Sequence, residues 1–393
     1  MATDSVQEAL RDHLTWWGLT HFTSDHEYFA WQRQQLTSEL LTQLSFLAER
    51  KREGDRQDEI AFYDLTASPV IFPVLYSQRY EYYEAVGRRI CASLVSAEAV
   101  LDFGCGPGIL TTFYARQFPE TTFVGLDRSR ALIAVAQRKA HELGIGNVRF
   151  DCVDVETDSL PGLYDLVIAT HALMQAEQDS GLPSRSWRTF EREHDPSLQS
   201  AFERRTGLGI RLDRVCEALR PNGRMILCEK TRQLARRVPF QRALSRRGFE
   251  LVEPADRIHY RTVEEAVDDG PFYLVQRGHQ AALVWDEMPE RDEPLACAEN
   301  MDPTVSDPDG PLYENHRPSA QTVWEGLRER VVVEETTRQA PDGRQLHVER
   351  GTTGALSYLY CANTFDQRQL VITAGTRSTL VQTYYQEIIR ELP

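Results

Sequence analysis

Cysteine is sparse and scattered in this 393-residue chain. Its seven cysteines are Cys91, Cys105, Cys152, Cys216, Cys228, Cys297 and Cys361. They form no Cys-x-x-Cys pair and are odd in number, so the sequence indicates neither a zinc site nor a disulfide framework. We expect reduced thiols, most of them buried as small apolar side chains, and no bound metal.

Long hydrophobic runs are lacking as well. No apolar stretch approaches the roughly 20 residues that a helix needs to cross a bilayer. The opening segment, MATDSVQEALRDHLTWWGL, has neither the basic start nor the apolar centre of a signal peptide. These features predict a cytoplasmic protein without a membrane partner.

Positive charge is also in short supply, because the formal net charge of −15 disfavours general binding to polyanions. Residues 229–248, EKTRQLARRVPFQRALSRRG, are an exception with seven basic residues and one acid. A solvated helix face is the simplest interpretation of this segment. Contact with an anionic acceptor or with RNA stays open.

What is present divides the chain into four regions. Residues 1–90 have apolar positions at helical spacing and many aromatics, which predicts a helical region. Residues 91–279 alternate strand-like and helix-like segments, the pattern of an α/β sheet. Residues 280–312 are acidic and proline-rich, which is typical of an extended linker, with an ordered strap as the alternative. Residues 313–393 predict a small accessory α+β domain with the element order α-β-β-β-β-α.

The most informative stretch is VLDFGCGPGILTTFYARQF, residues 100–118, where a hydrophobic strand ends on Asp102 and three glycines precede a helix. Gly104, Gly106 and Gly108 permit a sharp turn and a close approach of the backbone to a ligand. Glycine-rich turns of this kind serve several cofactors, so the motif alone is weakly specific.

Further acids follow the next strands. Asp127 ends TTFVGLD, about twenty residues on, where an acid in a doubly wound sheet accepts hydrogen bonds from both ribose hydroxyls. Asp154 follows the strand in NVRFDCVDVET, and YDLVIATHAL and PNGRMILCEK supply a fourth and a fifth strand. Because the carboxyl ends of parallel strands share one edge of the sheet, these residues are expected to surround one ligand.

In order and spacing, VLDFGCGPG, FVGLD, FDCVDVE, YDLVIATHAL and LRPNGRMIL resemble the motifs of the class I S-adenosylmethionine-dependent methyltransferases. The resemblance covers roughly residues 85–279, about half of the chain. It implies a Rossmann-like, seven-stranded, mostly parallel sheet with helices on both faces, in which GFELVEP and PFYLVQRG are the sixth and seventh strands. A nicotinamide dehydrogenase is the nearest rival, but its G-x-G-x-x-G fingerprint would need glycine where Ile109 stands.

The resemblance also implies a site for the methyl donor S-adenosylmethionine. Asp102 would lie beneath the methionine amino group, and Asp127 would hold the ribose. Asp154 and Val155 would meet the adenine edge. The implied donor site comprises Asp102, Gly104, Cys105, Gly106, Gly108, Asp127, Arg128, Asp154, Val155 and Thr170. A turn or helix cap is the alternative role for Asp102 and Asp154.

His171, directly after the fourth strand, is the candidate catalytic residue. A histidine there would act as a general base toward an acceptor hydroxyl or amine. The alternative is a packing residue or a spectator in the pocket wall. Methyl transfer from a sulfonium is an in-line displacement, for which alignment and desolvation can suffice, so a dedicated base is optional.

Two further segments are candidates for substrate contact. Residues 62–83, FYDLTASPVIFPVLYSQRYEYY, would form a lid over donor and acceptor, or else belong to the ordinary core. The lid candidates are Tyr63, Tyr76, Tyr80, Tyr82 and Tyr83. The segment of residues 174–207 is longer than the family needs, and its Trp187 and Phe190 are candidates for the acceptor pocket.

The sequence therefore predicts a cytoplasmic enzyme that transfers a methyl group from S-adenosylmethionine to an O or N atom of a small molecule, releasing S-adenosylhomocysteine. A methyltransferase acting on protein or RNA and a non-catalytic S-adenosylmethionine-binding module are the alternatives. The C-terminal domain would serve dimerisation, substrate delivery or structural cover, so a homodimer is among the arrangements considered.

Overall fold

The computed structural model describes residues 3–53, 56–263, 265–278, 283–290, 292, 311–340 and 343–391. The chain divides into two compact units. The first comprises residues 1–179, 199–232 and 239–285, and the second comprises residues 180–198, 233–238 and 286–393. The second unit thus takes two segments from inside the region 91–279, which the sequence analysis assigns to one domain. Most of the expected linker, 280–312, lies outside the described residues.

The first unit begins with helices, as the spacing of apolar residues over 1–90 predicts. They are α1 (Thr3–Trp16), α2 (Asp25–Gln35), α3 (Ser38–Glu53), α4 (Arg56–Thr66), α5 (Ile71–Ser77) and α6 (Tyr80–Ser93). Leu10 and Leu14 of α1 are fully buried in the same core as Val86 and Ile90 of α6. The two helices approach closely at Gly87, where an added Cβ atom would lie 2.9 Å from the side chain of Leu10.

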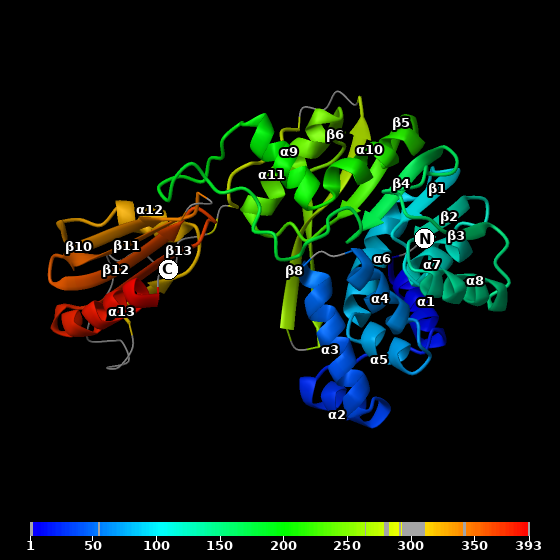
Figure 1. Cartoon of the computed structure of the whole chain (residues 1–393), viewed down its shortest axis with the longest axis horizontal. Helices are drawn as coiled ribbons and strands as arrows, with labels where there is room; N and C mark the ends of the chain where they lie inside the picture. Colours follow the sequence, from blue (N-terminus) through cyan, green and yellow to red (C-terminus); the bar gives the residue numbers. More distant parts are fainter. Residues whose placement is uncertain are drawn as a thin grey trace. The chain divides into compact units, whose positions relative to one another are not determined.

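An eight-stranded sheet forms the centre of the first unit (Figure 1). Its strands are β1 (Ala99–Phe103), β2 (Thr122–Asp127), β3 (Val148–Cys152), β4 (Tyr164–Thr170), β5 (Leu219–Cys228), β6 (Phe249–Leu251), β7 (Asp256–Thr262) and β8 (Glu265–Arg277). The order is β3-β2-β1-β4-β5-β8-β6, and β7 pairs with β8. Strands β1 to β5 run parallel, whereas β8 runs antiparallel to β5. Val100 and Leu101 of β1 are fully buried, as expected for a central parallel strand.

Helices follow several of these strands. They are α7 (Ile109–Gln117), α8 (Arg130–Glu142), α9 (Pro196–Arg205), α10 (Leu208–Ala218) and α11 (Leu234–Arg246). Ile133 and Ala136 of α8 pack with Phe150 of β3, and Phe113 of α7 packs in the core that contains Val100. The Rossmann-like, mostly parallel sheet predicted from the sequence is confirmed.

β7 adds an eighth strand to the seven that the resemblance implies. It forms a hairpin with the first half of β8, turning at Val263, whose φ is 59°. Residues 265–268 pair only with β7 and read as an acidic loop in the sequence, so they carry no apolar alternation that would reveal a strand. β6 and the second half of β8 are the predicted sixth and seventh strands.

The second unit contains a five-stranded antiparallel sheet with α13 along one side (Figure 1). Its elements are β9 (Tyr313–Asn315), α12 (Ser319–Glu325), β10 (Arg330–Gln339), β11 (Gln345–Thr353), β12 (Leu356–Asn363), β13 (Arg368–Ala374), a short 3-10 turn η2 (Gly375–Arg377) and α13 (Ser378–Glu391). The sheet order is β10-β11-β12-β13-β9. The predicted order α-β-β-β-β-α is present, and β9, only three residues long, is the strand that the sequence analysis missed.

Alternate residues of β12 face opposite sides of this sheet. Leu359 packs with Val348 of β11 and Val381 of α13. Tyr358 and Tyr360 pack on the other side in a second apolar cluster that includes α12. The unit therefore has helices and an apolar core on both faces of its sheet.

Trp187 and Phe190, the candidates for the acceptor pocket, belong to a segment of the second unit. Trp187 belongs to the core of the second unit, where its ring stacks on that of His347 with centroids 3.6 Å apart. The guanidinium of Arg368 lies 4.3 Å from the ring centroid of Phe190. Burial of a large apolar indole in this core explains why the segment joins the second unit.

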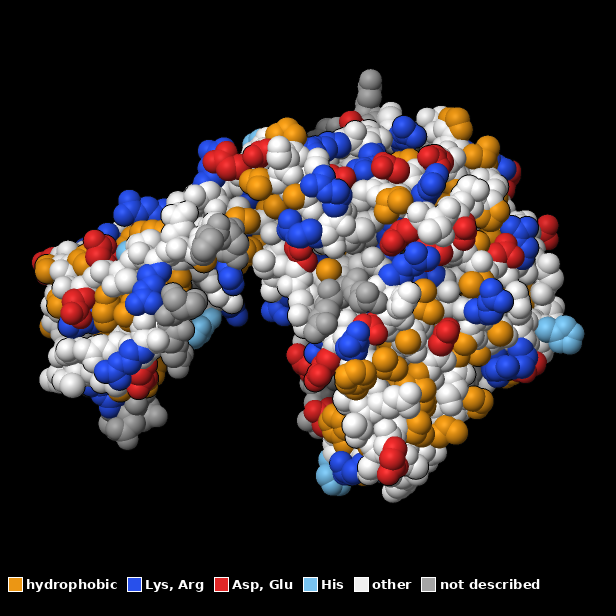
Figure 2. All heavy atoms as spheres, viewed as in Figure 1, with side chains coloured by type: hydrophobic (Ala, Val, Ile, Leu, Met, Phe, Trp, Pro, Cys, Tyr) orange, Lys and Arg blue, Asp and Glu red, His pale blue; other side chains and the backbone are white. Residues whose placement is uncertain are grey.

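The basic segment 229–248 is only partly a solvated helix face. Arg236 and Arg237 are 5% and 4% exposed. Arg247 donates to Asp213 at 2.7 Å and to Glu203 at 3.1 Å. On the face shown in Figure 2, Lys and Arg side chains are interspersed with Asp and Glu side chains. These arginines are therefore largely engaged in internal contacts instead of being presented to a phosphate backbone.

The structure bears on the expectations for the cysteines and for membrane-spanning helices. The six described cysteines are free thiols, and Cys297 lies outside the described residues. No single helix of the described chain is long and apolar enough to cross a membrane. α4 and α5 pass that test only as a pair, bent by 105°.

Candidate active site

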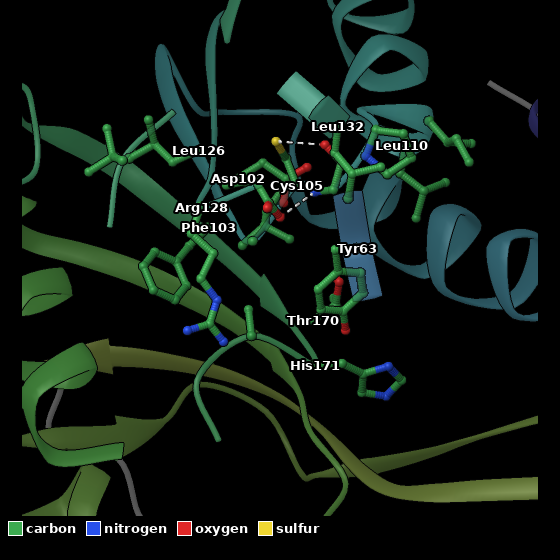
Figure 3. A pocket seen from close by; sticks show the side chains of 18 of the residues that line it. Tyr63, Asp102, Phe103, Cys105, Leu110, Leu126, Arg128, Leu132, Thr170 and His171 are labelled. Carbon is green, nitrogen blue, oxygen red and sulfur yellow. Dashed lines mark hydrogen bonds between the residues drawn. The ribbon is translucent and has the colours of Figure 1, made fainter. Parts of the chain in front are cut away.

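A cavity lies at the carboxyl ends of the parallel strands of the first unit (Figure 3). β1, β2 and β4 bring their last residues to its wall. Ten of the eleven predicted site residues line it: Asp102, Gly104, Cys105, Gly106, Asp127, Arg128, Asp154, Val155, Thr170 and His171. Gly108 does not. The strand topology thus brings together residues that are up to 69 positions apart, Asp102 and His171.

The three glycines of the turn after β1 have positive φ angles but different surroundings. At Gly104 (φ 75°) an added Cβ atom would lie 2.4 Å from Cβ of Ala172, so this position needs glycine for packing. At Gly106 (φ 55°) nothing lies within 4 Å of such an atom, which leaves its backbone open to a ligand. Gly108 packs against Phe150 at 2.8 Å and begins α7, which explains why it is absent from the cavity wall.

Asp102 is a buried carboxylate without a cationic partner among the described residues. It is 5% exposed, and Thr111 Oγ1 donates a hydrogen bond to its Oδ2 at 2.5 Å. Burial above all, together with the nearby charge of Asp127, raises the pKa of Asp102 to about 6, although the hydrogen bond from Thr111 acts in the opposite direction. A ligand ammonium group would stabilise the ionised form.

Asp127 connects two turns at the edge of the sheet. Its Oδ1 accepts a hydrogen bond from the backbone N–H of Ser129 at 2.8 Å, and its Oδ2 accepts one from Gly106 at 3.0 Å. Burial nevertheless raises the pKa of this carboxyl group. Each oxygen keeps a second lone pair, so the carboxylate can also accept from hydroxyl groups of a ligand.

Helix α4 contributes residues to the site that the sequence analysis missed. Glu59 lines the cavity and forms an ion pair with Arg128, and Arg56 forms one with Asp154. Asp64 accepts a hydrogen bond from Ser129 Oγ at 2.6 Å. The helical spacing of Arg56, Glu59 and Tyr63 could have indicated that these residues share one helix face, because they stand at positions i, i+3 and i+7.

The aromatic residues of the lid candidate fall into two groups. Tyr63, Tyr76, Tyr82 and Tyr83 line the cavity. Tyr80 does not line it; its ring lies 5.1 Å from that of His21. Figure 3 shows Tyr63, Thr170 and His171 among the side chains that line the cavity.

His171 is held from three sides. Its ring stacks on Tyr82 with centroids 5.1 Å apart, and an Arg79 guanidinium nitrogen lies 2.7 Å from Nδ1. Nε2 lies 3.0 Å from Oδ2 of Asp269, which also accepts from the hydroxyl of Tyr260. Because a guanidinium only donates, Nδ1 is the accepting nitrogen. Burial above all lowers the pKa of His171 to about 4, so the ring is neutral near pH 7.

Arg79 and Asp269 are therefore site residues that sequence reasoning missed. Arg79 stands at the start of α6 and Asp269 within β8, 92 positions before and 98 positions after His171. No local motif joins them. Their approach depends on β8 pairing with β5 beside β4.

A buried carboxylate supports the loop that carries His171. Glu229 accepts hydrogen bonds from the backbone N–H groups of Ala172 and Leu173, both at 2.8 Å. Arg211, on the cavity wall, donates to the carbonyl of Ala172 at 2.7 Å and to Glu156 at 3.0 Å. Burial raises the pKa of Glu229 to about 7. The loop is thus fixed by internal contacts before any ligand binds.

Comparison with known proteins places part of this site, including the ends of β1, β2 and β4, in a recognised domain. Residues 94–256 match the sequence model of a family described as "Methyltransferase domain". Trans-aconitate 2-methyltransferase of Deinococcus radiodurans is 36% identical over 88 residues, 22% of this chain and 32% of that protein. Malonyl-[acyl-carrier protein] O-methyltransferase of Bacillus cereus is 29% identical over 100 residues, 23% of this chain and 36% of that protein. The chain spans about a third of the length of these curated relatives.

A solved structure is similar over a longer stretch. Magnesium protoporphyrin IX methyltransferase from Synechocystis PCC 6803, with bound SAM, is 20% identical, with a TM-score of 0.35. The similarity covers 52% of this chain and 81% of that one. The family match and the strand order β3-β2-β1-β4-β5-β8-β6, with the glycine turn after β1, identify residues 94–256 as a class I methyltransferase domain.

Proposed function

We propose that the chain is an S-adenosylmethionine-dependent methyltransferase whose acceptor is an O or N atom of a small molecule. The observation that carries the proposal is the pair of carboxylates, Asp102, which is buried, and Asp127, which is half-buried, beside the open backbone of Gly106. Neither carboxylate has a cationic side chain within ion-pair distance among the described residues. Withdrawing a carboxylate from water without such a partner costs free energy. A ligand with an ammonium group and hydroxyls would offset that cost by pairing with the two carboxylates.

The residues present fit this donor. Asp102 would bind the amino group of its methionine part, and Asp127 would accept from the ribose hydroxyls. Asp154 and Val155 lie on the wall where the adenine edge would bind. When bound, S-adenosylmethionine supplies an electrophilic methyl group on a positively charged sulfur. The aromatic wall formed by Tyr63, Tyr76, Tyr82 and Tyr83 and by α4 would exclude water around that group.

The chain's own contribution to the transfer is chiefly alignment. His171 stays the predicted catalytic residue, but its Nδ1 already accepts from Arg79, and its neutral ring is fixed by Tyr82 and Asp269. It can take a proton from an acceptor only if Arg79 withdraws. An acceptor that is nucleophilic as bound needs no base, because positioning the two reactants supplies much of the rate enhancement.

A small-molecule acceptor accords best with the charge of the chain. RNA is the less favoured acceptor, since the net charge is −15 and Arg236 and Arg237 are buried. A curated relative named trans-aconitate 2-methyltransferase supports a small-molecule acceptor, whereas one named malonyl-[acyl-carrier protein] O-methyltransferase acts on a group carried by a protein. The second unit would bind a carrier or a partner chain, or cover part of the first unit.

Two measurements test the proposal. Calorimetric titration of the purified chain with S-adenosylhomocysteine should give one binding site per chain. Incubation with cell extract and methyl-deuterated donor should then place the label in the small-molecule fraction, as read by mass spectrometry. Label in the protein or RNA fraction would show that the acceptor is a protein or an RNA and not a small molecule. Binding without any label transfer would support a non-catalytic module, and absence of binding would refute the donor site.

A further inference from the structure

Three arginines line the cavity, and one of them differs from the other two. Arg128 forms an ion pair with Glu59, and Arg211 forms one with Glu156. Arg79 has no carboxylate within 4.0 Å among the residues that the structure describes. Charged groups withdrawn from water in proteins are ordinarily paired, so this guanidinium lacks its expected partner.

The neighbours of Arg79 occupy only part of its hydrogen-bonding capacity. One terminal nitrogen donates to Nδ1 of His171 at 2.7 Å, and the guanidinium carbon lies 4.3 Å from the ring centroid of Tyr82. Neither neighbour is an anion, because an imidazole ring carries no negative charge and burial raises the pKa of Tyr82 well above its usual value. Asp269, whose charge does act on Arg79, lies on the other side of His171 and accepts from Tyr260. A guanidinium has five N–H groups, which leaves a fork for an incoming acceptor.

The charge distribution of the cavity is consequently divided. Asp102 and Asp127, at the ends of β1 and β2, form no ion pair with a cationic side chain of the part of the chain that the structure describes. Arg79, beside His171 after the end of β4, has no carboxylate within ion-pair distance among the described residues, and Asp269 is separated from it by the ring of His171. The charges of Arg79 and Lys230 disfavour protonation of His171, whereas Asp269 on its other side favours it, so this side of the cavity carries two cations and one acid. One end of the site thus fits an ammonium group and the other fits an anion.

We propose that Arg79 is the carboxylate-binding residue of the cavity. This inference rests on the proposed function, since it concerns the ligands of the same site. A planar carboxylate matches the guanidinium fork with two parallel hydrogen bonds. Two molecules can bring such a group, namely the donor through its α-carboxylate and the acceptor through a carboxylate of its own. His171 and, behind it, Asp269 would be positioning residues that hold the fork toward the cavity.

Substitution of Arg79 and three probes separate the two sources. Arg79→Gln and Arg79→Lys are compared with the parent by calorimetry at constant ionic strength. The probes are S-adenosylhomocysteine, 5′-methylthioadenosine, which lacks the amino-acid part, and malonate added to protein saturated with S-adenosylhomocysteine. Malonamide, the neutral analogue, serves as the ligand control. Arg138→Gln is the matched variant, because it removes one arginine that is exposed on α8.

The results show which carboxylate, that of the donor or that of the acceptor, binds Arg79. If the donor's carboxylate binds Arg79, Arg79→Gln weakens S-adenosylhomocysteine at least tenfold and leaves 5′-methylthioadenosine unchanged. If the acceptor's carboxylate binds there, donor affinity is unchanged, and the parent prefers malonate over malonamide while the variant loses that preference. Arg79→Lys, which keeps the charge without the fork, should give an intermediate loss and covers the case in which Arg79→Gln does not fold.

The inference is overturned if Arg79→Gln and Arg79→Lys both match the parent with every probe. It is also overturned if the parent shows no preference for malonate and both Arg79 variants bind S-adenosylhomocysteine normally. Failure of the proposed function looks different, because the parent itself would then bind neither S-adenosylhomocysteine nor 5′-methylthioadenosine.

Discussion

Asp127 and Gly106 are joined by a hydrogen bond of 3.0 Å from the backbone N–H of the glycine to the carboxylate. This bond connects the turn after β1 to the end of β2. A second bond, from the N–H of Ser129, holds the other oxygen at 2.8 Å. The carboxylate of Asp127 therefore holds the two turns of the proposed donor site in place, in addition to lining that site.

Substitution Asp127→Ala should weaken binding of S-adenosylhomocysteine at least tenfold, or about 1.4 kcal/mol, because two charge-assisted hydrogen bonds to the ribose are lost. Calorimetric titration measures the change. Asp151→Ala is the matched control, since that acid pairs with Arg149 on the exposed side of β3. Equal affinities of Asp127→Ala and the parent would contradict the ribose assignment.

Donor affinity should depend on pH through Asp102, whose pKa is raised to about 6 by burial. Below that pH the free protein carries a proton on Asp102, which the ligand's ammonium group must displace. Affinity for S-adenosylhomocysteine should therefore rise between about pH 5 and pH 7, by up to tenfold per pH unit at the acidic end, and then level off.

Two controls isolate this effect. Asp102→Asn should bind S-adenosylhomocysteine more weakly at pH 7 and lose the dependence in that window. 5′-Methylthioadenosine lacks the amino-acid part and therefore has no ammonium group to pair with Asp102, so the parent should bind it with little change over the same range. A slope that persists in Asp102→Asn would assign the titration to another group.

Docking of α4 should depend on Asp64. Asp64→Ala removes the acceptor of the bond from Ser129 Oγ and of a longer one from the N–H of Ala131, a loss of about 1–2 kcal/mol. Hydrogen exchange should accelerate within residues 56–66 while that of β1 stays unchanged. Asp58→Ala is the control on the same helix, because Asp58 pairs with Arg50 of α3. Unchanged protection of α4 in Asp64→Ala would show that other contacts hold it.

Trp187→Ala should destabilise the second unit without affecting donor binding. Loss of the stack on His347 and of the surrounding apolar contacts should cost about 3 kcal/mol or more in the free energy of unfolding. Denaturant unfolding gives that value, and calorimetry with S-adenosylhomocysteine gives donor affinity. Trp16→Ala, at a tryptophan that is 39% exposed, should cost much less. Weaker donor binding in Trp187→Ala would contradict the expectation that this tryptophan stabilises the second unit alone.

The parts of the fold that were predicted from the sequence are those with strong local patterns. The apolar run ending on Asp102, the glycines after it and the helical spacing of residues 1–90 each predict an element whose presence is confirmed. β7 was missed because its partner half of β8 reads as an acidic loop, and β9 because it has three residues. Trp187 was assigned to the acceptor pocket because an insertion after the fourth strand often lies there in the family, whereas its indole is buried in the second unit.

Taken alone, the sequence determined which residues stand at the ends of β1, β2 and β4, because strand periodicity and glycine turns are properties of neighbouring positions. Strand order then brings Asp102, Asp127 and Thr170 to one edge. Only the tertiary structure decided that Arg79 and Asp269 meet at His171, and that Glu59 pairs with Arg128. These contacts join segments far apart in the chain, and they depend on how helices and the β8 hairpin pack, which no local pattern records.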